Sequence, residues 1–131
     1  MPDDRVLRVV VVRKGKVKPI EFRLRDDEIG LSLFRTADLP DPQAIIAAVR
    51  AAGKQGELGL AEIPLSVFHR LGLRLVHTPG GTGEPAVNAL HVEARPPWWR
   101  RLVLWFRHVP IHEWFNERIT PELAAAAKII E

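Results

Sequence analysis

The sequence predicts an α+β fold: a mainly antiparallel sheet of five to six strands, one or two packed helices and a C-terminal helical segment. Short apolar runs separated by turn residues indicate the strands. One helix with clear start and stop residues lies in the middle of the chain, and a Trp- and Arg-rich stretch near the end has helical periodicity. We therefore expect a core domain at residues 1–95. A helical extension at residues 96–131 then packs on the core or projects from it.

Three strands come first, and the short turns between them favour an antiparallel meander. Residues 5–12 are rich in valine, which predicts a buried strand. Residues 20–25 alternate between apolar and charged side chains, which predicts a strand with one solvated face. Residues 29–34 alternate again after an Asp-Asp turn, and they complete the meander.

A helix follows, with recognisable residues at both ends. Asp41 suits the N-cap, Pro42 suits the first helical position, and Gly53 suits the position just after the last turn. Beyond this helix we expect strands at residues 59–63 and 73–77, with a short helix between them that begins at Pro64.

The last predicted strand covers residues 88–95, after a Gly- and Pro-rich loop at residues 79–85. From Trp98 onward, apolar side chains fall on one side of a helical wheel and arginines on the other, with Leu104 as an exception. Pro110 is expected to end this helix. A final helix should begin at Thr120-Pro121 and run to Glu131.

The composition limits the classes of function. The chain of 131 residues, 47% hydrophobic and 27% charged, suits one globular domain. It has no cysteine, which excludes disulfides, thiolate nucleophiles and cysteine-based metal sites. We expect a cytoplasmic protein without a transmembrane segment, because neither a secretory signal nor a long apolar run is present. The net charge of +3 is mild, and residues 95–108 hold four arginines and no acid.

The catalytic and metal-binding motifs are incomplete. The glycines around Gly80 lack the Gly-Lys-Ser/Thr sequence and the following helix of a phosphate loop. Ser32 lacks the second small residue that a nucleophile elbow needs. His108 and His112 have the spacing of a shared metal, but Pro110 breaks the helix between them. We therefore expect no metal and no cofactor.

One set of ionisable side chains could carry chemistry. On the last predicted strand, His91, Glu93 and Arg95 share one face. In a cleft, Glu93 could orient His91 as a general base, and Arg95 could hold an anion. The alternative, which we favour, is a solvated sheet face with an ordinary ion pair.

The aromatic and basic side chains of the C-terminal segment are the candidate partner-binding residues. They are Trp98, Trp99, Arg100, Arg101, Trp105, Arg107 and Trp114. Trp and Arg anchor many protein interfaces, so a partner protein or a second copy of the chain could bind them. The segment could also pack on its own sheet, which ranks first, or lie on an anionic membrane or stack on single-stranded bases. Four arginines without a lysine disfavour nucleic acid.

Residues 16–95 resemble a widespread group of small bacterial proteins. The shared pieces are residues 30–35 (GLSLFR), 59–63 (GLAEI), 71–73 (LGL) and 88–93 (NALHVE). The resemblance implies a place in a multi-gene bacterial system, defence-related clusters included. It supplies no catalytic residue and does not reach the Trp-rich segment.

Three hypotheses for the function follow. The first is a non-enzymatic interaction module of a bacterial multi-component system, defence-related systems included, with residues 98–114 contributing the contact surface. The second is a small enzyme or nucleotide-binding domain that uses His91, Glu93 and Arg95. The third is single-stranded nucleic-acid binding through the Arg- and Trp-rich segment.

Overall fold

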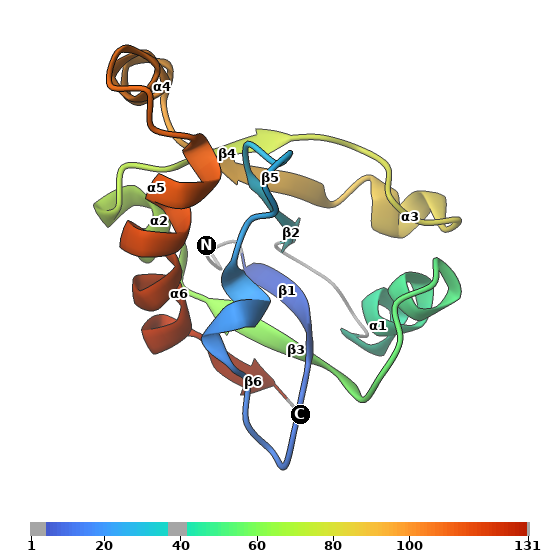
Figure 1. Ribbon diagram of the computed structural model, residues 1–131. Coiled ribbons are helices and arrows are strands. Elements are labelled where there is room, and N and C mark those ends of the chain that lie inside the picture. Colours follow the sequence, from blue (N-terminus) through green and yellow to red (C-terminus); the bar gives the residue numbers. More distant parts are fainter. Residues whose placement is uncertain (1–4, 37–41, 131) are drawn as a thin grey trace.

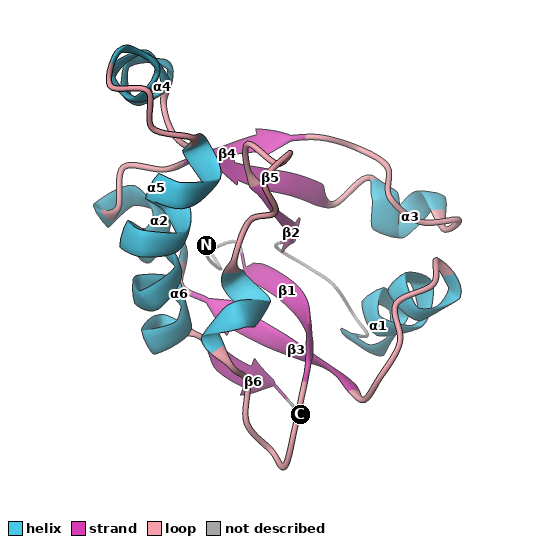
Figure 2. Cartoon of the chain, viewed as in Figure 1, coloured by secondary structure: helices cyan, strands magenta, loops and turns pink. Residues whose placement is uncertain are grey.

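The computed structural model describes residues 5–36 and 42–130, and it shows one antiparallel sheet with helices on both faces (Figures 1 and 2). The strands are β1 (Arg5–Val11), β2 (Leu31–Thr36), β3 (Leu58–Ile63), β4 (Arg74–His77), β5 (His91–Arg95) and β6 (Lys128–Ile130). The helices are the 3₁₀ helix η1 (Pro19–Phe22) and the α-helices α1 (Pro42–Ala51), α2 (Leu65–Arg70), α3 (Pro85–Asn88), α4 (Trp98–Phe106), α5 (Ile111–Arg118) and α6 (Thr120–Ala126). The α+β class with a mainly antiparallel sheet is confirmed.

The strands lie in the order β4-β5-β2-β1-β3-β6, and each neighbouring pair is antiparallel. β1 lies inside the sheet and buries side chains on both faces, which explains its nearly continuous run of valines. β1 and β2 pair only through residues 5–7 and 34–36. Beyond this short ladder the two strands diverge.

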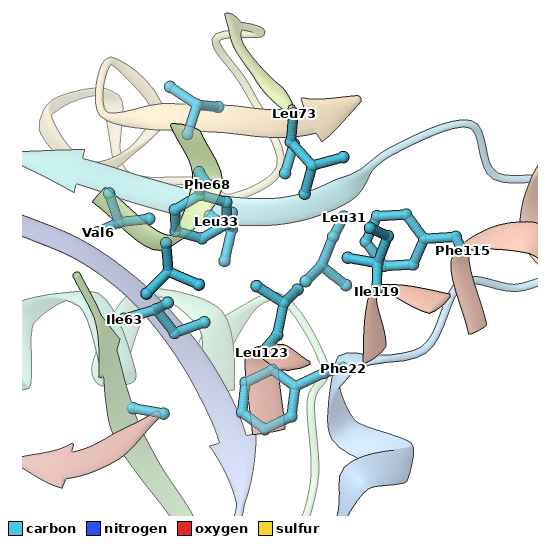
Figure 3. Packing of buried hydrophobic residues seen from close by; sticks show 14 of the residues in the cluster. Val6, Phe22, Leu31, Leu33, Ile63, Phe68, Leu73, Phe115, Ile119 and Leu123 are labelled. Atoms are coloured by element: carbon cyan, nitrogen blue, oxygen red, sulfur yellow. The ribbon is translucent and has the colours of Figure 1, made fainter. Parts of the chain in front are cut away.

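Two hydrophobic clusters hold the helices against the sheet. α2, α5, α6 and η1 pack on one face, and α1 and α3 pack on the other (Figures 1 and 2). The first cluster combines side chains of β1, β2, β3 and β5 with Phe115, Ile119 and Leu123 from the C-terminal segment (Figure 3). Phe115 and Leu123 are fully buried. The segment after β5 therefore supplies part of the core.

The strand expected at residues 20–25 is absent, and that prediction is wrong. Pro19 begins η1, and the chain after Phe22 is irregular. Phe22 and Leu24 are nevertheless buried, as their alternation with charged residues indicated. The period-two pattern here reflects burial of one side of the chain without pairing in the sheet.

Side chains of α5 and α6 take the place of a strand neighbour for this segment. The Asn116 amide oxygen accepts the Leu24 N–H at 2.7 Å, and its amide nitrogen donates to the Leu24 carbonyl at 2.9 Å. A neighbouring strand would satisfy the same two groups. The Thr120 hydroxyl donates to the Phe22 carbonyl at 2.7 Å. The backbone of residues 22–24 is thus held by residues about 100 positions away in the chain.

Three further boundaries were predicted with different success. α1 lies where expected, with Gly53 in the left-handed conformation after its last turn (φ 114°), while the predicted cap Asp41 lies outside the described residues. Residues 85–88 form α3, so the last central strand begins at His91 rather than at residue 88. The final helix ends at Ala126, and the β-branched residues after it add an edge strand to β3, so the expected helix to Glu131 is wrong.

Candidate functional site

α4 stands apart from the rest of the molecule (Figure 1). It begins after Pro97, whose extended backbone (φ −66°, ψ 160°) prepares the first turn. It ends at Phe106, because His108 adopts a left-handed conformation (φ 57°) and the Val109 N–H bonds back to the Leu104 carbonyl at 3.0 Å. The helix therefore stops before Pro110, which the sequence indicated as its end.

The apolar side of α4 faces away from the body of the protein. Leu104 is 5% exposed, whereas Trp98, Trp105 and Phe106 are each exposed by about 70%. The exposed apolar residues, which we call the apolar arc, are Trp98, Trp99, Leu102, Val103, Trp105 and Phe106. With 3.6 residues per turn, they span roughly 160° of the helix surface, opposite the sector that holds Leu104. An amphipathic surface helix ordinarily turns its wide apolar side toward the core, so this orientation is reversed.

Arg100 joins α4 to the body. Its guanidinium lies 4.7 Å from the ring centre of Trp99 and 5.6 Å from that of Trp114 on α5. Trp114 is half-buried and packs against the first hydrophobic cluster. The stack of Trp99, Arg100 and Trp114, together with buried Leu104, holds α4 in its projecting orientation.

A hollow lies beside the apolar arc. It has a volume of about 480 Å³, and its walls come from α4 and from the connection to α5. The lining residues are Trp98, Arg101, Leu102, Leu104, Trp105, Val109, Pro110 and Ile111. The surface therefore combines a convex aromatic ridge with an apolar depression that has an arginine in its wall.

The residues predicted to bind a partner fall into two groups. Five are exposed, namely Trp98, Trp99, Arg101, Trp105 and Arg107, and two are half-buried, namely Arg100 and Trp114. The half-buried pair contributes to the position of α4. The candidate set omitted Leu102, Val103 and Phe106, although the helical wheel had placed these residues beside the tryptophans.

His91, Glu93 and Arg95 share one face of β5, and no hydrogen bond joins Glu93 to His91. Arg95 donates instead to Glu93, with a nitrogen-to-oxygen distance of 2.7 Å. The His91 Nδ1 lies 2.7 Å from the Thr78 carbonyl oxygen and 2.9 Å from the Thr78 hydroxyl oxygen. His91 also contacts the ring of Phe34 edge to face, with ring centres 5.5 Å apart. Glu93 therefore forms an ion pair with Arg95, as in the alternative that the sequence analysis favoured, and does not orient His91.

Another polar site lies where β1 and β2 diverge, and no local sequence motif indicated it. Two adjoining hollows of about 540 and 520 Å³ share four lining residues, Arg8, Arg25, Ser32 and Lys54; we call this region the cationic hollow. His91 lines the second hollow, whereas Glu93 and Arg95 line neither. Three cations thus gather from β1, from the loop after η1 and from the residue that follows Gly53, while Glu21 and Glu28 line the first hollow only.

Local structure fixes the Arg8 side chain and the Lys54 backbone. Arg8 lies at the divergence and donates to the carbonyls of Glu21 and Ser32, both at 2.6 Å. The left-handed Gly53 turns the chain, and the Lys54 N–H bonds to the Val49 carbonyl at 3.3 Å. Burial lowers the pKa of Lys54, and the charge of Arg8 lowers that pKa further.

Two other kinds of site are absent from the described residues, 5–36 and 42–130. These residues contain no group of three or more His, Asp or Glu side chains that could hold a metal ion. Within the same ranges, each helix is too short or too polar to cross a lipid bilayer. Comparison with protein-family models, with curated proteins and with solved structures gives no match to this chain.

Proposed function

We propose that this protein is a non-enzymatic interaction module that docks a protein partner through α4. The observation that carries the proposal is the orientation of this helix: its apolar arc points outward while Leu104 points inward. Exposed aromatic side chains at such density are rare on a surface that water alone covers. Trp98, Leu102 and Trp105 also have the i, i+4, i+7 spacing by which a helix binds in an apolar groove.

The charges around the arc define the partner. Arg100, Arg101 and Arg107 are near it, and the sequence has no acid between residues 95 and 112. Two copies of α4 packed together would bring these arginines close to one another, which disfavours self-association. We therefore propose a different protein, with an apolar groove that has carboxylates along its rim.

The hollow beside α4 favours a protein as the partner rather than a lipid membrane. A flat membrane can receive the ridge, but it offers no projecting group to fill a depression of about 480 Å³. A protein side chain can fill the depression and pair its own carboxylate with Arg101. The place of this module in a bacterial multi-component system, including a defence-related one, rests on the resemblance of residues 16–95 to small bacterial proteins.

The experiment is site-specific photo-crosslinking in the cells that produce the protein. A photoreactive amino acid at Leu102 should capture one partner protein, identified by mass spectrometry. The same photoreactive amino acid in place of Ile20 should not capture this partner, because Ile20 is 61% exposed but lies far along the chain, on η1. The purified partner should then bind the unmodified chain, and Trp98→Ser with Trp105→Ser should weaken binding by about 30-fold or more.

Three results would overturn the proposal. One is crosslinking at Leu102 only to a second copy of the chain, with a dimer mass in solution. Another is flotation of the protein with anionic vesicles that depends on the tryptophans. A third is equal affinity of the double Trp variant and the Ile20→Ser control for the captured protein.

A further inference from the structure

We propose that the cationic hollow binds the phosphate group of a small molecule. This inference is independent of α4 and of its proposed partner. It rests on three positive side chains, Arg8, Arg25 and Lys54, which line the same hollow at the divergence of β1 and β2.

The three cations have no bound counter-charge. Among the described residues, no carboxylate lies within 4.0 Å of any of their nitrogens. Two acids, Glu21 and Glu28, line the first hollow and attract Arg8 without pairing with it, and neither lines the second hollow. Glu21 accepts the Val11 N–H at 2.8 Å, and Glu28 accepts the Arg25 N–H at 2.7 Å. Arg8 and Lys54 are half-buried, whereas Arg25 is exposed. A half-buried charge without an ion-pair partner costs free energy, which a bound anion would offset.

The gap between the strands explains why Arg8 is held in this position. Because β2 leaves β1 after a three-residue ladder, the Ser32 carbonyl lacks a partner on β1 and accepts from Arg8. A second Arg8 nitrogen donates to the Glu21 carbonyl on η1. Only carbonyls accept hydrogen bonds from these nitrogens, so no carboxylate is bonded to the guanidinium, although Glu21 and Glu28 offset part of its charge in the first hollow.

The rest of the hollow suits a phosphate ester of a small molecule. The Ser32 hydroxyl lines both hollows and has no hydrogen-bond partner among the described residues, so it is available to a phosphate oxygen. His91 presents its Nε2, because Nδ1 is bonded to Thr78. Phe34 and Val49 supply an apolar wall. A volume of about 520 Å³ is in the range of small-molecule sites.

The loop opposite the strands is fixed in advance of ligand binding. Asn88 accepts the Thr82 N–H at 2.8 Å and donates to the Thr82 carbonyl at 2.7 Å. The Asn88 carbonyl accepts the Gly80 N–H at 3.2 Å. Gly81 lies against the ring of His91, and a Cβ at Gly81 would come 3.9 Å from that ring. The Gly-rich loop thus forms a wall of the site, although it lacks the sequence of a phosphate loop.

The experiment uses the full chain and three probes at constant ionic strength: inorganic phosphate, phenyl phosphate and chloride. Amide NMR spectra should show saturable shifts at Ser32, Lys54 and Thr82 with both phosphates and none with chloride. Phenyl phosphate should bind more tightly than inorganic phosphate, because its ring can pack on Phe34 and Val49. The variants are Lys54→Gln and Arg25→Gln, with Lys16→Gln as a control that removes an exposed lysine outside both hollows.

Removal of one charge-assisted contact should weaken binding about tenfold in Lys54→Gln and in Arg25→Gln. Lys16→Gln should bind as the unmodified protein does. The proposal would be overturned by the absence of saturable shifts, by shifts centred on Arg100 and Arg101, or by equal weakening in all three variants. Phenyl phosphate binding no tighter than inorganic phosphate would overturn the assignment of the apolar wall. An amide spectrum with native dispersion in each variant establishes that a loss of binding is not a loss of folding.

Discussion

Replacement of Asn116 by alanine should destabilise the protein well beyond what its place on the outer part of α5 suggests. The side chain makes two hydrogen bonds to the backbone of Leu24, a residue that is 4% exposed. Alanine would leave the Leu24 N–H and carbonyl without these partners. An unsatisfied buried group costs about 1–3 kcal/mol, so we expect a loss of about 2–4 kcal/mol in the free energy of unfolding.

Urea unfolding followed by Trp fluorescence measures this loss. Glu117→Ala is the matched control, because Glu117 is the next residue of α5 and is exposed; it should change the free energy by no more than about 0.5 kcal/mol. Asn116→Asp separates the two bonds, since a carboxylate keeps the acceptor for the Leu24 N–H but places an oxygen against the Leu24 carbonyl. That contact favours the protonated acid and raises its pKa in the folded state. The deficit of this variant relative to the unmodified protein should therefore shrink as the pH falls toward about 4, the ordinary pKa of aspartate, and should stay constant below it.

A loss below about 1 kcal/mol in Asn116→Ala would refute the reasoning. It would mean that water satisfies Leu24 equally well and that α5 does not hold the segment after η1. A loss in Glu117→Ala as large as that in Asn116→Ala would also refute it, because the effect would then belong to the helix and not to the amide.

Three further predictions concern stability. Thr120→Val removes the buried hydroxyl that donates to the Phe22 carbonyl, and calorimetry should show that the free energy of unfolding falls by about 1–3 kcal/mol. An unchanged free energy of unfolding would show that water solvates this carbonyl. His108 has a left-handed backbone conformation (φ 57°), which is strained in a residue with a side chain. His108→Gly removes this strain and should raise the free energy of unfolding by about 1 kcal/mol. A decrease would mean that the imidazole itself stabilises the end of α4. Lys54→Gln should raise the melting temperature without phosphate, because burial and the charge of Arg8 lower the pKa of Lys54 in the folded state, so the charged lysine disfavours folding. The increase in melting temperature should be largest below the pKa of Lys54 in the folded protein, and it should disappear as the pH approaches about 10.4, the ordinary pKa of lysine. An increase that does not depend on pH would contradict this prediction.

The projecting helix shows how far the sequence reaches toward a candidate site. Helical periodicity after Pro97 was sufficient to predict α4 and to place its apolar residues on one side. It did not decide which side would face the body. The structure turns Leu104 inward and holds it there with the stack of Arg100 between Trp99 and Trp114, which lie on two different helices.

The cationic hollow could not be predicted from any one segment. In the sequence, Arg8 stands within a valine-rich run, Arg25 stands just before the Asp-Asp turn, and Lys54 follows Gly53. Each has an ordinary local reason for its place. Their shared position depends on the divergence of β1 from β2, which is a property of strand pairing.

By itself, the sequence determined the fold class, the ends of α1 and the existence of a basic aromatic helix near the C-terminus. These features depend on interactions between residues a few positions apart, such as caps, turns and periodic burial. Only the tertiary structure decided that residues 22–24 pair with Asn116 and Thr120 instead of with a strand, and that the last residues extend the sheet. Buried backbone groups accept any partner with the correct geometry, and a partner about 100 residues away is invisible to local patterns.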